Sequence, residues 1–355
     1  MTNVMGRRAL SDILKTAAEA RASDVHLVTG APPMMRVAGD IARMPGEPLA
    51  AGEIDSLLES VLSEHLRSTF REKQRLCVSL LFEGVGYSRV TLYRSKGNVE
   101  AAFRLATRDI ASLSSLGLPN KAGELLEKRS GLILVTGATG TGKTTTLNSM
   151  INTINGQRRA KIVTLEDPIE YYHEHRKSIV VQQEMLTDFD DFNSGLIHVL
   201  RQDPDIIVVG EMRDLGTITT TLLAADTGHL VLATLHTQGA TGSVDRIVDA
   251  FPLSSRSYIA AQLSSALVAV ISQLLLPTLD GKSRVLAYEV LIANKAVKNI
   301  IREGKIQTLD NTLVTGASEG MISMDRCLKE LYQRGAISYD TAIANVRDPR
   351  SFRNI

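Results

Sequence analysis

The chain has 355 residues, a length that predicts about two domains. Hydrophobic residues make up 44% of it and charged residues 22%, which is typical of a soluble globular protein and excludes a disordered or fibrous chain. The 40 Lys and Arg residues balance 39 Asp and Glu residues, and the resulting net charge of +1 predicts no general affinity for nucleic acid.

Hydropathy and cysteine content favour a cytoplasmic setting. The longest apolar stretch, residues 266–276, is interrupted by Ser272 and Gln273 and is shorter than the roughly 18 to 20 residues that a membrane span needs. The N-terminal residues lack the apolar core and cleavage site of a signal peptide. Cys77 and Cys327 are the only cysteines, which excludes a disulfide framework and an all-cysteine zinc site. We therefore expect a cytoplasmic protein without direct membrane insertion.

Residues 1–108 are expected to form a mixed α+β domain. Apolar side chains from Leu10 to Ala18 follow helical spacing, and a second amphipathic pattern predicts one helix over residues 54–70. The turn residues Lys96-Gly97-Asn98 predict a hairpin. Short apolar runs predict strands over residues 25–28, 34–37, 77–82, 87–94 and 99–105.

Residues 106–119 differ in character from the chain on either side. They show little periodicity and end in Gly117 and Pro119. We assign residues 109–119 as an interdomain linker, which leaves residues 120–355 as the second domain. An ordinary loop within one domain is the alternative interpretation.

The second domain alternates strand and helix patterns. Its apolar runs are typical of strands that are buried on both faces of a parallel sheet. A helix is predicted from Lys143 to about Ile154, and the chain beyond Pro252 is expected to be mainly helical. The predicted strands cover residues 132–136, 162–165, 206–209 and 230–234.

The loop after the first of these strands matches the phosphate-binding pattern G-x-x-x-x-G-K-[ST] at every fixed position. Its glycines let backbone N–H groups converge on an anion, and the following helix directs its N-terminal dipole at the phosphates. We expect Lys143 to reach the β- and γ-phosphates of ATP and the Thr144 hydroxyl to ligate Mg²⁺. The predicted nucleotide-binding residues are Gly137, Ala138, Thr139, Gly140, Thr141, Gly142, Lys143, Thr144 and Thr145.

Two further strands end in carboxylates. Glu211 follows the run at residues 206–209 and is expected to hold the Mg²⁺ shell or to orient and deprotonate the attacking water. Glu166 and Asp167 follow the run at residues 162–165, and we expect them to share metal and water duties, with Asp167 as a metal ligand. The ordinary alternatives are a surface carboxylate for Glu211 and a simple turn at Asp167-Pro168.

The histidines divide into one candidate and six others. His236 follows the run at residues 230–234, so it is expected at the same sheet edge as Glu166, Glu211 and the phosphate loop, where it could sense the γ-phosphate. A strand-end histidine with a structural hydrogen bond is the alternative. His173 and His175 are interpreted as a solvated loop pair.

Together these motifs carry a resemblance to a known family. The phosphate loop, TLEDPIEY, DPDIIVVGEMRD and TGHLVLATLHT match, in order and spacing, the motifs of the type II and type IV secretion ATPase superfamily. Within it the chain resembles the PilT-type pilus retraction ATPases. That likeness extends to Ser23-Asp24-Val25-His26-Leu27 near the N-terminus and to the segments AVKNIIREG and GMISMD near the C-terminus.

The resemblance implies a PAS-like N-terminal domain and a RecA-like ATPase domain that assemble into a homo-hexameric ring. Arginines of the N-terminal domain would approach the nucleotide, and Arg89 and Arg104 match those positions best. Surface arginine is the ordinary interpretation of both. The family's pilus assembly ATPases carry a four-cysteine zinc site that two cysteines cannot build, which favours retraction over extension.

The expected function is thus ATP hydrolysis with Mg²⁺ that drives type IV pilus retraction through an inner-membrane platform protein, with the chain peripheral at the inner membrane. Two alternatives stay open. One is an ATPase of a type IV secretion or conjugation system, and the other is an accessory nucleotide-binding regulator without a motor role.

Overall fold

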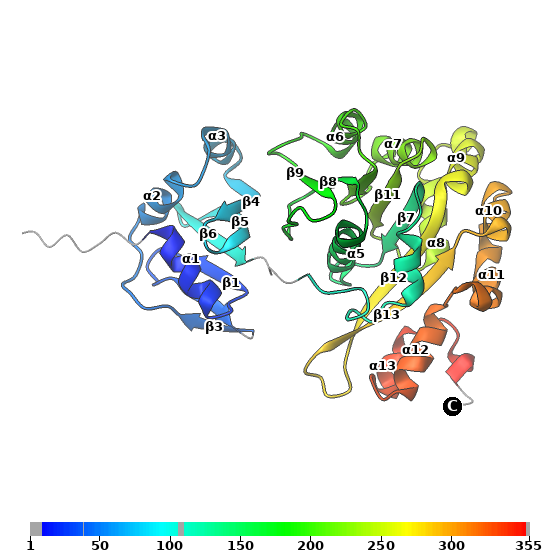
Figure 1. The fold of residues 1–355 in the computed structure, drawn as a ribbon. Helices are drawn as coiled ribbons and strands as arrows, with labels where there is room; N and C mark the ends of the chain where they lie inside the picture. The colour runs from blue at the N-terminus through cyan, green and yellow to red at the C-terminus, as the bar shows by residue number, and fades with distance from the viewer. Residues whose placement is uncertain (1–8, 38, 106–109, 353–355) are drawn as a thin grey trace, which may run out of the picture. The chain divides into compact units, whose positions relative to one another are not determined.

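The structure, a computed structural model, describes residues 9–37, 39–105 and 110–352. It divides into two compact units (Figure 1). The first consists of the chain up to Asp109 together with Asp167–Tyr172 and Glu184–Asp188. The second contains Ile110–Glu166, His173–Gln183 and the chain from Phe189 onward.

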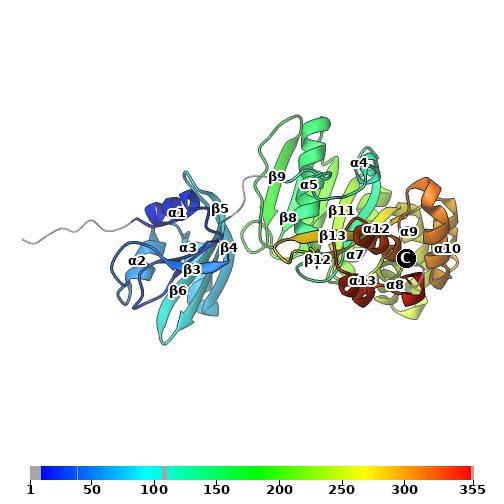
Figure 2. The ribbon, with the colours of Figure 1, turned by 90° about the horizontal axis from the view of Figure 1, so that it is seen from below.

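The first unit is built on a six-stranded antiparallel sheet with the order β3-β2-β1-β6-β5-β4. Helix α1 lies against one face of this sheet (Figure 2). The predicted α+β character is confirmed. The elements are α1 (Leu10–Glu19), β1 (Asp24–Leu27), β2 (Met34–Val37), β3 (Asp40–Arg43), α2 (Glu53–Glu59), α3 (Glu64–Lys73), β4 (Arg75–Phe82), β5 (Gly86–Ser95) and β6 (Asn98–Leu105).

Local sequence explains most of these elements. The apolar residues at helical spacing in α1 are buried against strand residues such as Val25 and Phe103. The hairpin turn is confirmed: Ser95 pairs with Asn98, and the two loop residues, Lys96 and Gly97, have positive φ angles of 51° and 83°. Two consecutive positive φ angles match the right-handed twist of the flanking strands.

One helix prediction in this unit is wrong. The amphipathic pattern over residues 54–70 forms two helices, α2 and α3. The break comes before Ser63, whose hydroxyl caps the second helix by accepting a hydrogen bond from the Leu66 N–H. Apolar periodicity continues across the break because both helices bury residues in the same core.

The second unit contains a seven-stranded sheet with the order β13-β12-β7-β11-β10-β8-β9. The pairs formed by β12, β7, β11, β10 and β8 are parallel, and β13 is antiparallel to β12. The strands are β7 (Gly131–Thr136), β8 (Lys161–Glu166), β9 (Ile179–Glu184), β10 (Ile206–Val209), β11 (Leu230–Leu235), β12 (Leu267–Pro277) and β13 (Arg284–Ile292).

The central strands are buried along their whole length, as their continuous apolar runs predict. Helix α5 packs on one face, where its buried residues join alternate residues of β7, β10 and β11 in one core. The helices are α4 (Asn120–Leu125), α5 (Lys143–Gln157), α6 (Phe192–Val199), α7 (Leu215–Asp226), α8 (Ala240–Asp249), α9 (Leu253–Ala266), α10 (Lys295–Arg302), α11 (Leu309–Thr315), α12 (Met324–Gln333) and α13 (Tyr339–Asn345). Short 3₁₀ turns cover Ile306–Thr308, Gly316–Glu319 and Pro349–Phe352.

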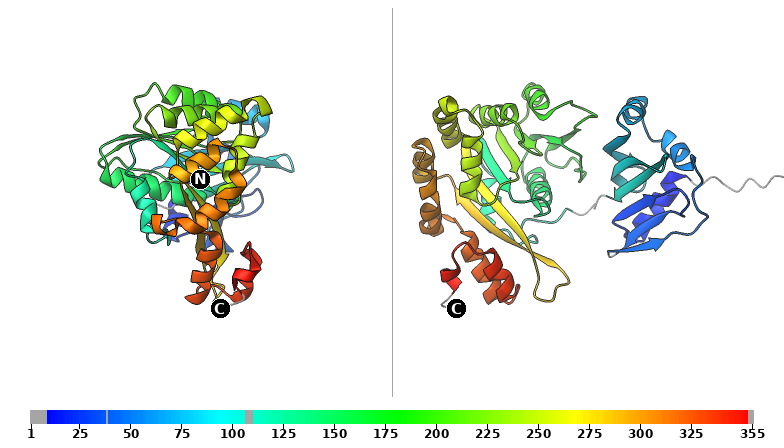
Figure 3. Two further views of the ribbon diagram at one scale, coloured as in Figure 1. Left: turned by 90° about the vertical axis from the view of Figure 1, so that its right-hand side faces the viewer. Right: turned by 180° about the vertical axis from the view of Figure 1, so that it is seen from behind.

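The region beyond Pro252 contains strands as well as the expected helices. Strand β12 pairs with β7 only as far as Ser272 and then continues with β13 alone, so the pair runs past the sheet (Figure 3). Helix α12 packs against this extension through a small core that includes Leu276 and Leu328. Ser272 and Gln273 are buried with partners: the Ser272 hydroxyl accepts from the Gly239 N–H at 2.9 Å, and Gln273 Nε2 donates to Thr146 Oγ1 at 2.7 Å. Across the described ranges, we find no helix with the length and hydropathy of a membrane span.

The expected linker lies partly outside the described residues, which exclude 106–109. Within its later part, Leu113 and Leu118 are buried in the core of the second unit. The domain boundary stays a prediction.

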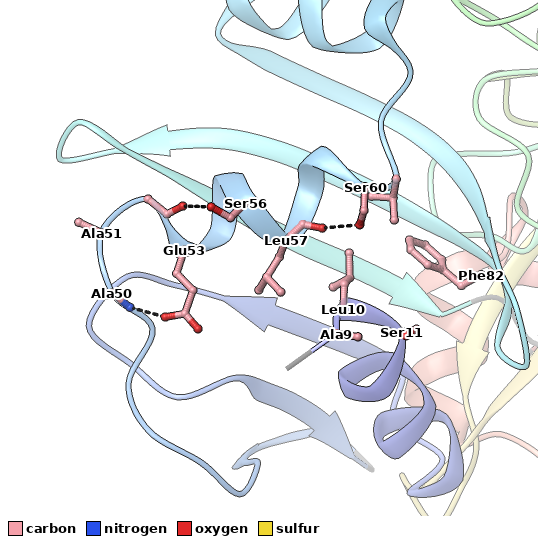
Figure 4. A pocket seen from close by; sticks show the side chains of 12 residues that line it. Ala9, Leu10, Ser11, Ala50, Ala51, Glu53, Ser56, Leu57, Ser60 and Phe82 are labelled. Atoms are coloured by element: carbon pink, nitrogen blue, oxygen red, sulfur yellow. Dashed lines mark hydrogen bonds between the residues drawn. The ribbon is translucent and has the colours of Figure 1, made fainter. Parts of the chain in front are cut away.

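A groove of about 750 Å³ opens in the first unit between the start of α1 and α2. Figure 4 shows Leu10, Leu57 and Phe82 on its walls. The Ala50 N–H donates a hydrogen bond to the Glu53 carboxylate at 2.8 Å. The residues that line it include none of the predicted site residues.

Candidate active site

Four parallel strands end at one edge of the second sheet, in the order β7, β11, β10, β8. The phosphate loop follows β7, His236 follows β11, Glu211 lies two residues beyond β10, and Glu166 ends β8. The predicted convergence of these residues on one edge is therefore confirmed. In parallel sheets of this kind, ligands bind at the carboxyl ends of the strands.

The phosphate loop requires glycine at its first position. Gly137 has a φ of 146°, and a Cβ there would lie 2.6 Å from both the Gln273 carbonyl oxygen and Thr141 Oγ1. At the end of the loop, Gly142 adopts the left-handed conformation and begins α5 without a side-chain cap. The first-turn N–H groups of α5 are thus directed at the position where a phosphate would bind.

Lys143 is held against this loop. Its Nζ donates to the carbonyl oxygens of Gly137 and Ala138, both at 2.9 Å. Burial lowers the pKa of Lys143 from its ordinary value, and the negative charge of Glu211 acts in the opposite direction. A partly desolvated ammonium group interacts more strongly with phosphate oxygens than one in bulk water.

Three threonines, Thr141 in the loop and Thr144 and Thr145 in the first turn of α5, carry hydroxyl groups at the site. Thr141 Oγ1 donates to the Ala138 carbonyl oxygen at 2.9 Å. Thr144 and Thr145 are half-buried in the first turn of α5. The Thr144 carbonyl oxygen accepts from Asn148 Nδ2 at 2.9 Å.

Glu211 is bonded on both carboxylate oxygens. Arg213 Nη2 lies 2.7 Å from its Oε2, and His236 Nε2 lies 3.3 Å from its Oε1. Sequence reasoning missed Arg213, although its place two residues after a strand-end carboxylate was the available signal. A cavity of about 510 Å³ beside these residues is lined by Glu211, Arg213, His236 and Arg246, among others.

Glu166 is almost fully buried, and its Oε1 accepts two hydrogen bonds. Thr164 Oγ1 donates at 2.6 Å and Gln182 Nε2 at 3.0 Å. The structure thus gives the two candidate carboxylates different surroundings, because Glu211 lies beside the guanidinium of Arg213, whereas Glu166 accepts from the neutral side chains of Thr164 and Gln182. Sequence reasoning missed Gln182, which lies 16 positions from Glu166.

The interpretation of His173 as a solvated residue is wrong. Its side chain is buried, with 3% exposure, and its Nε2 lies 2.7 Å from Asn148 Oδ1 on α5. Burial and, secondarily, the charge of Arg176 lower the pKa of His173 to about 4. His175 is exposed, as expected.

Arg89 and Arg104 belong to the first unit and are paired directly across β5 and β6. Arg89 Nε donates to Cys77 Sγ at 3.3 Å, and its Nη1 lies 3.8 Å from Glu170 Oε1. Arg104 Nε lies 3.0 Å from Asp24 Oδ1. These are contacts with residues of the same unit, so the proposed role of both arginines at a nucleotide stays a prediction.

The oxygen-bearing side chains of the site suit Mg²⁺ better than a metal ion that needs three or more protein ligands. Within residues 9–37, 39–105 and 110–352, no group of three or more His, Cys, Asp or Glu side chains could hold a metal ion. Mg²⁺ at a nucleotide is usually held by one or two protein oxygens together with phosphates and waters. The hydroxyl of Thr144 and the carboxylates of Glu211 and Asp167, which directly follows β8, are oxygen donors of this kind.

Comparison with known proteins agrees with this geometry. Residues 98–347 match the family described as type II/IV secretion system protein. The chain is 39% identical over 343 residues to the type IV pilus retraction ATPase PilT of Pseudomonas aeruginosa, an alignment that covers 97% of this chain and 99% of that protein. It is 40% identical over 343 residues to a twitching motility protein of Neisseria gonorrhoeae, with 97% and 92% covered. It also superposes on the crystal structure of the pilus retraction motor PilT with bound ADP at a TM-score of 0.90 and 42% identity, with 98% of this chain and 100% of that chain covered.

Proposed function

The chain belongs to the type II/IV secretion system protein family and is a PilT-type ATPase, and from this premise we propose that it is the hexameric motor of type IV pilus retraction. The observation that carries the proposal is similarity to retraction and twitching proteins over almost the whole chain, N-terminal domain included. A likeness confined to the nucleotide-binding motifs would fit any member of the superfamily.

In the proposed reaction, the chain's own residues position ATP and offset its charge. The phosphate-loop N–H groups and Lys143 hold the β- and γ-phosphates. Thr144, Glu211 and Asp167 would hold Mg²⁺, which would neutralise part of the phosphate charge when bound. Glu211 orients the attacking water and accepts its proton, because it lies at the strand end nearest His236 and keeps part of its carboxylate exposed.

The proposed motor is a hexameric ring that acts on a membrane-embedded partner protein. Arg89 and Arg104 of the N-terminal domain offset the negative charge of the transition state. The rotation of domains during turnover acts on an inner-membrane platform protein. The chain is then peripheral at the inner membrane through that partner.

A gene deletion in the native host tests this function. We expect excess surface pili in electron micrographs and loss of twitching, both restored by the wild-type chain and not by Lys143→Ala. Bald cells would contradict the proposal by indicating pilus assembly. An unchanged pilus count would assign the chain to a secretion or conjugation machine, and substrate transfer would then be measured.

A further inference from the structure

The buried imidazole of His173 lies between two parts of the candidate site that are far apart in sequence. It belongs to the loop that follows β8, and it contacts α5, the helix that begins at Lys143. Its hydrogen bonds on either side connect the loop to residues of the candidate site.

On the side of α5, the bonds lead to Thr144. Asn148 Nδ2 donates to the Thr144 carbonyl oxygen at 2.9 Å, so Asn148 Oδ1 is the acceptor that faces His173 Nε2 at 2.7 Å. This arrangement assigns the proton of the imidazole to Nε2. Within the described residues, Nδ1 is buried without a hydrogen-bond partner.

On the side of the sheet, the bonds lead to Glu166. The His173 backbone N–H donates to Gln182 Oε1 at 2.9 Å. Because Oε1 is the acceptor in that bond, Gln182 presents its Nε2, which donates to Glu166 Oε1 at 3.0 Å. The orientation of this amide therefore depends on where the His173 backbone is held.

We propose that His173 is a positioning residue that couples the magnesium-binding turn at Thr144 to the carboxylate of Glu166. Its imidazole anchors the loop to Asn148, and the anchored backbone sets Gln182 and through it Glu166. The inference rests on the proposed role of Thr144 as a magnesium ligand and on the expected share of Glu166 in metal and water duties. His173 touches neither nucleotide nor metal in this scheme.

The full-length protein carrying His173→Leu tests the coupling. Leucine fills the space without a donor, whereas His173→Gln retains a donor near the position of Nε2. Replacement of a residue that orients a metal ligand typically costs roughly 10- to 100-fold. We expect His173→Leu to lower kcat about tenfold and to raise the Mg²⁺ concentration for half-maximal activity, and His173→Gln to restore most of both. His198→Leu, at an exposed histidine on α6, is the control.

Two further variants separate the two sides of the network. Gln182→Met removes the donor to Glu166 and is expected to lower kcat while leaving the Mg²⁺ requirement near that of the wild type. Asn148→Leu removes the link to Thr144 and is expected to raise the Mg²⁺ requirement. These variants keep the test valid if His173→Leu does not fold.

The proposal is overturned if folded His173→Leu keeps kcat and Mg²⁺ dependence within twofold of the wild type, or if His173→Gln loses as much as His173→Leu. Lys143→Ala is measured alongside. Turnover that survives in Lys143→Ala would contradict the assigned ATPase site itself, whereas an inactive Lys143→Ala with normal His173→Leu would reject the coupling alone.

Discussion

The imidazole Nε2 of His236 lies 3.3 Å from Oε1 of Glu211. On its other side, His236 Nδ1 lies 3.3 Å from the hydroxyl of Thr139 in the phosphate loop. One side chain therefore joins the strand-end carboxylate to the predicted phosphate loop. A shift of the loop on nucleotide binding would be transmitted to the carboxylate through this ring.

Replacement of His236 by alanine is expected to lower kcat about 10- to 100-fold, because Glu211 loses the group that orients it towards the loop. Nucleotide affinity should change less, since the phosphate-loop N–H groups and Lys143 remain. Steady-state ATPase assays and ADP titration measure the two quantities. His198→Ala, in an exposed position on α6, is the control, and an equal loss in both variants would contradict the role of His236.

Gly210 lies where two strand ends approach closely. A Cβ at this position would lie 2.9 Å from the Leu165 carbonyl oxygen, so Gly210→Ala must push β10 and β8 apart and displace Glu211. We expect a loss of about 1–3 kcal/mol in the free energy of unfolding, together with reduced turnover. Gly156→Ala, in α5 with open space around the new Cβ, should instead stabilise the protein by about 0.5 kcal/mol. Urea denaturation compares them, and equal effects would argue against the steric explanation.

Protonation of His173 should destabilise the fold at acidic pH. Its pKa falls from 6.5 to about 4 in the folded protein, so the unfolded chain binds the proton more readily between these values. Stability contributed by the neutral ring is complete above pH 6.5 and is lost as the pH falls towards 4, with a limit of about 3 kcal/mol. His173→Gln should therefore show a shallower fall of unfolding free energy from pH 7 to 4 than the wild type. Parallel curves would contradict the shift.

Arg347 interacts with a carboxylate that is almost inaccessible. Its Nη2 lies 3.2 Å from Oε1 of Glu289, which is 1% exposed and also accepts from the Ala240 N–H at 2.6 Å. Arg347→Ala leaves that carboxylate without its cation, and because the arginine is itself half-exposed we expect a cost of about 1–2 kcal/mol. Arg334→Ala breaks an exposed pair with Glu330 and should cost less than about 0.5 kcal/mol. Chemical denaturation of both variants makes the comparison.

The Arg104→Ala variant distinguishes between two roles of Arg104, a surface ion pair with Asp24 and a contribution to ATP turnover. Its partner Asp24 lies 3.0 Å away and the arginine is 68% exposed, so the pair contributes at most about 1 kcal/mol to stability. We expect ATP turnover to fall while nucleotide binding and assembly are retained. Arg94→Ala, on the same sheet, is the control. Loss of nucleotide binding in Arg104→Ala would contradict a role limited to the transition state.

Much of the second unit could be predicted because its signals are local. The runs at residues 206–209 and 230–234 are too apolar and too short for anything but buried strands, and they form β10 and β11. Strand β3 was missed because its side chains are mostly exposed. Strand β12 was not predicted because its apolar run is interrupted by Ser272 and Gln273, whose side-chain hydrogen bonds go to Gly239 and Thr146 in other parts of the chain.

The residues alone determined the phosphate loop and its helix, because both depend on backbone geometry within a few residues of chain. They also predicted a common edge for His236, Glu211 and Glu166, because the parallel strands that precede these residues end on the same side of a sheet. Tertiary packing determined the hydrogen-bond partners of the side chains at this edge. Gln182 and the Asn148–His173 pair became visible only when loops and helices were brought within about 3 Å of one another, the distance that a hydrogen bond requires. The same packing buried His173, whose charged neighbours in sequence suggest exposure, because its ring turns away from them and onto α5.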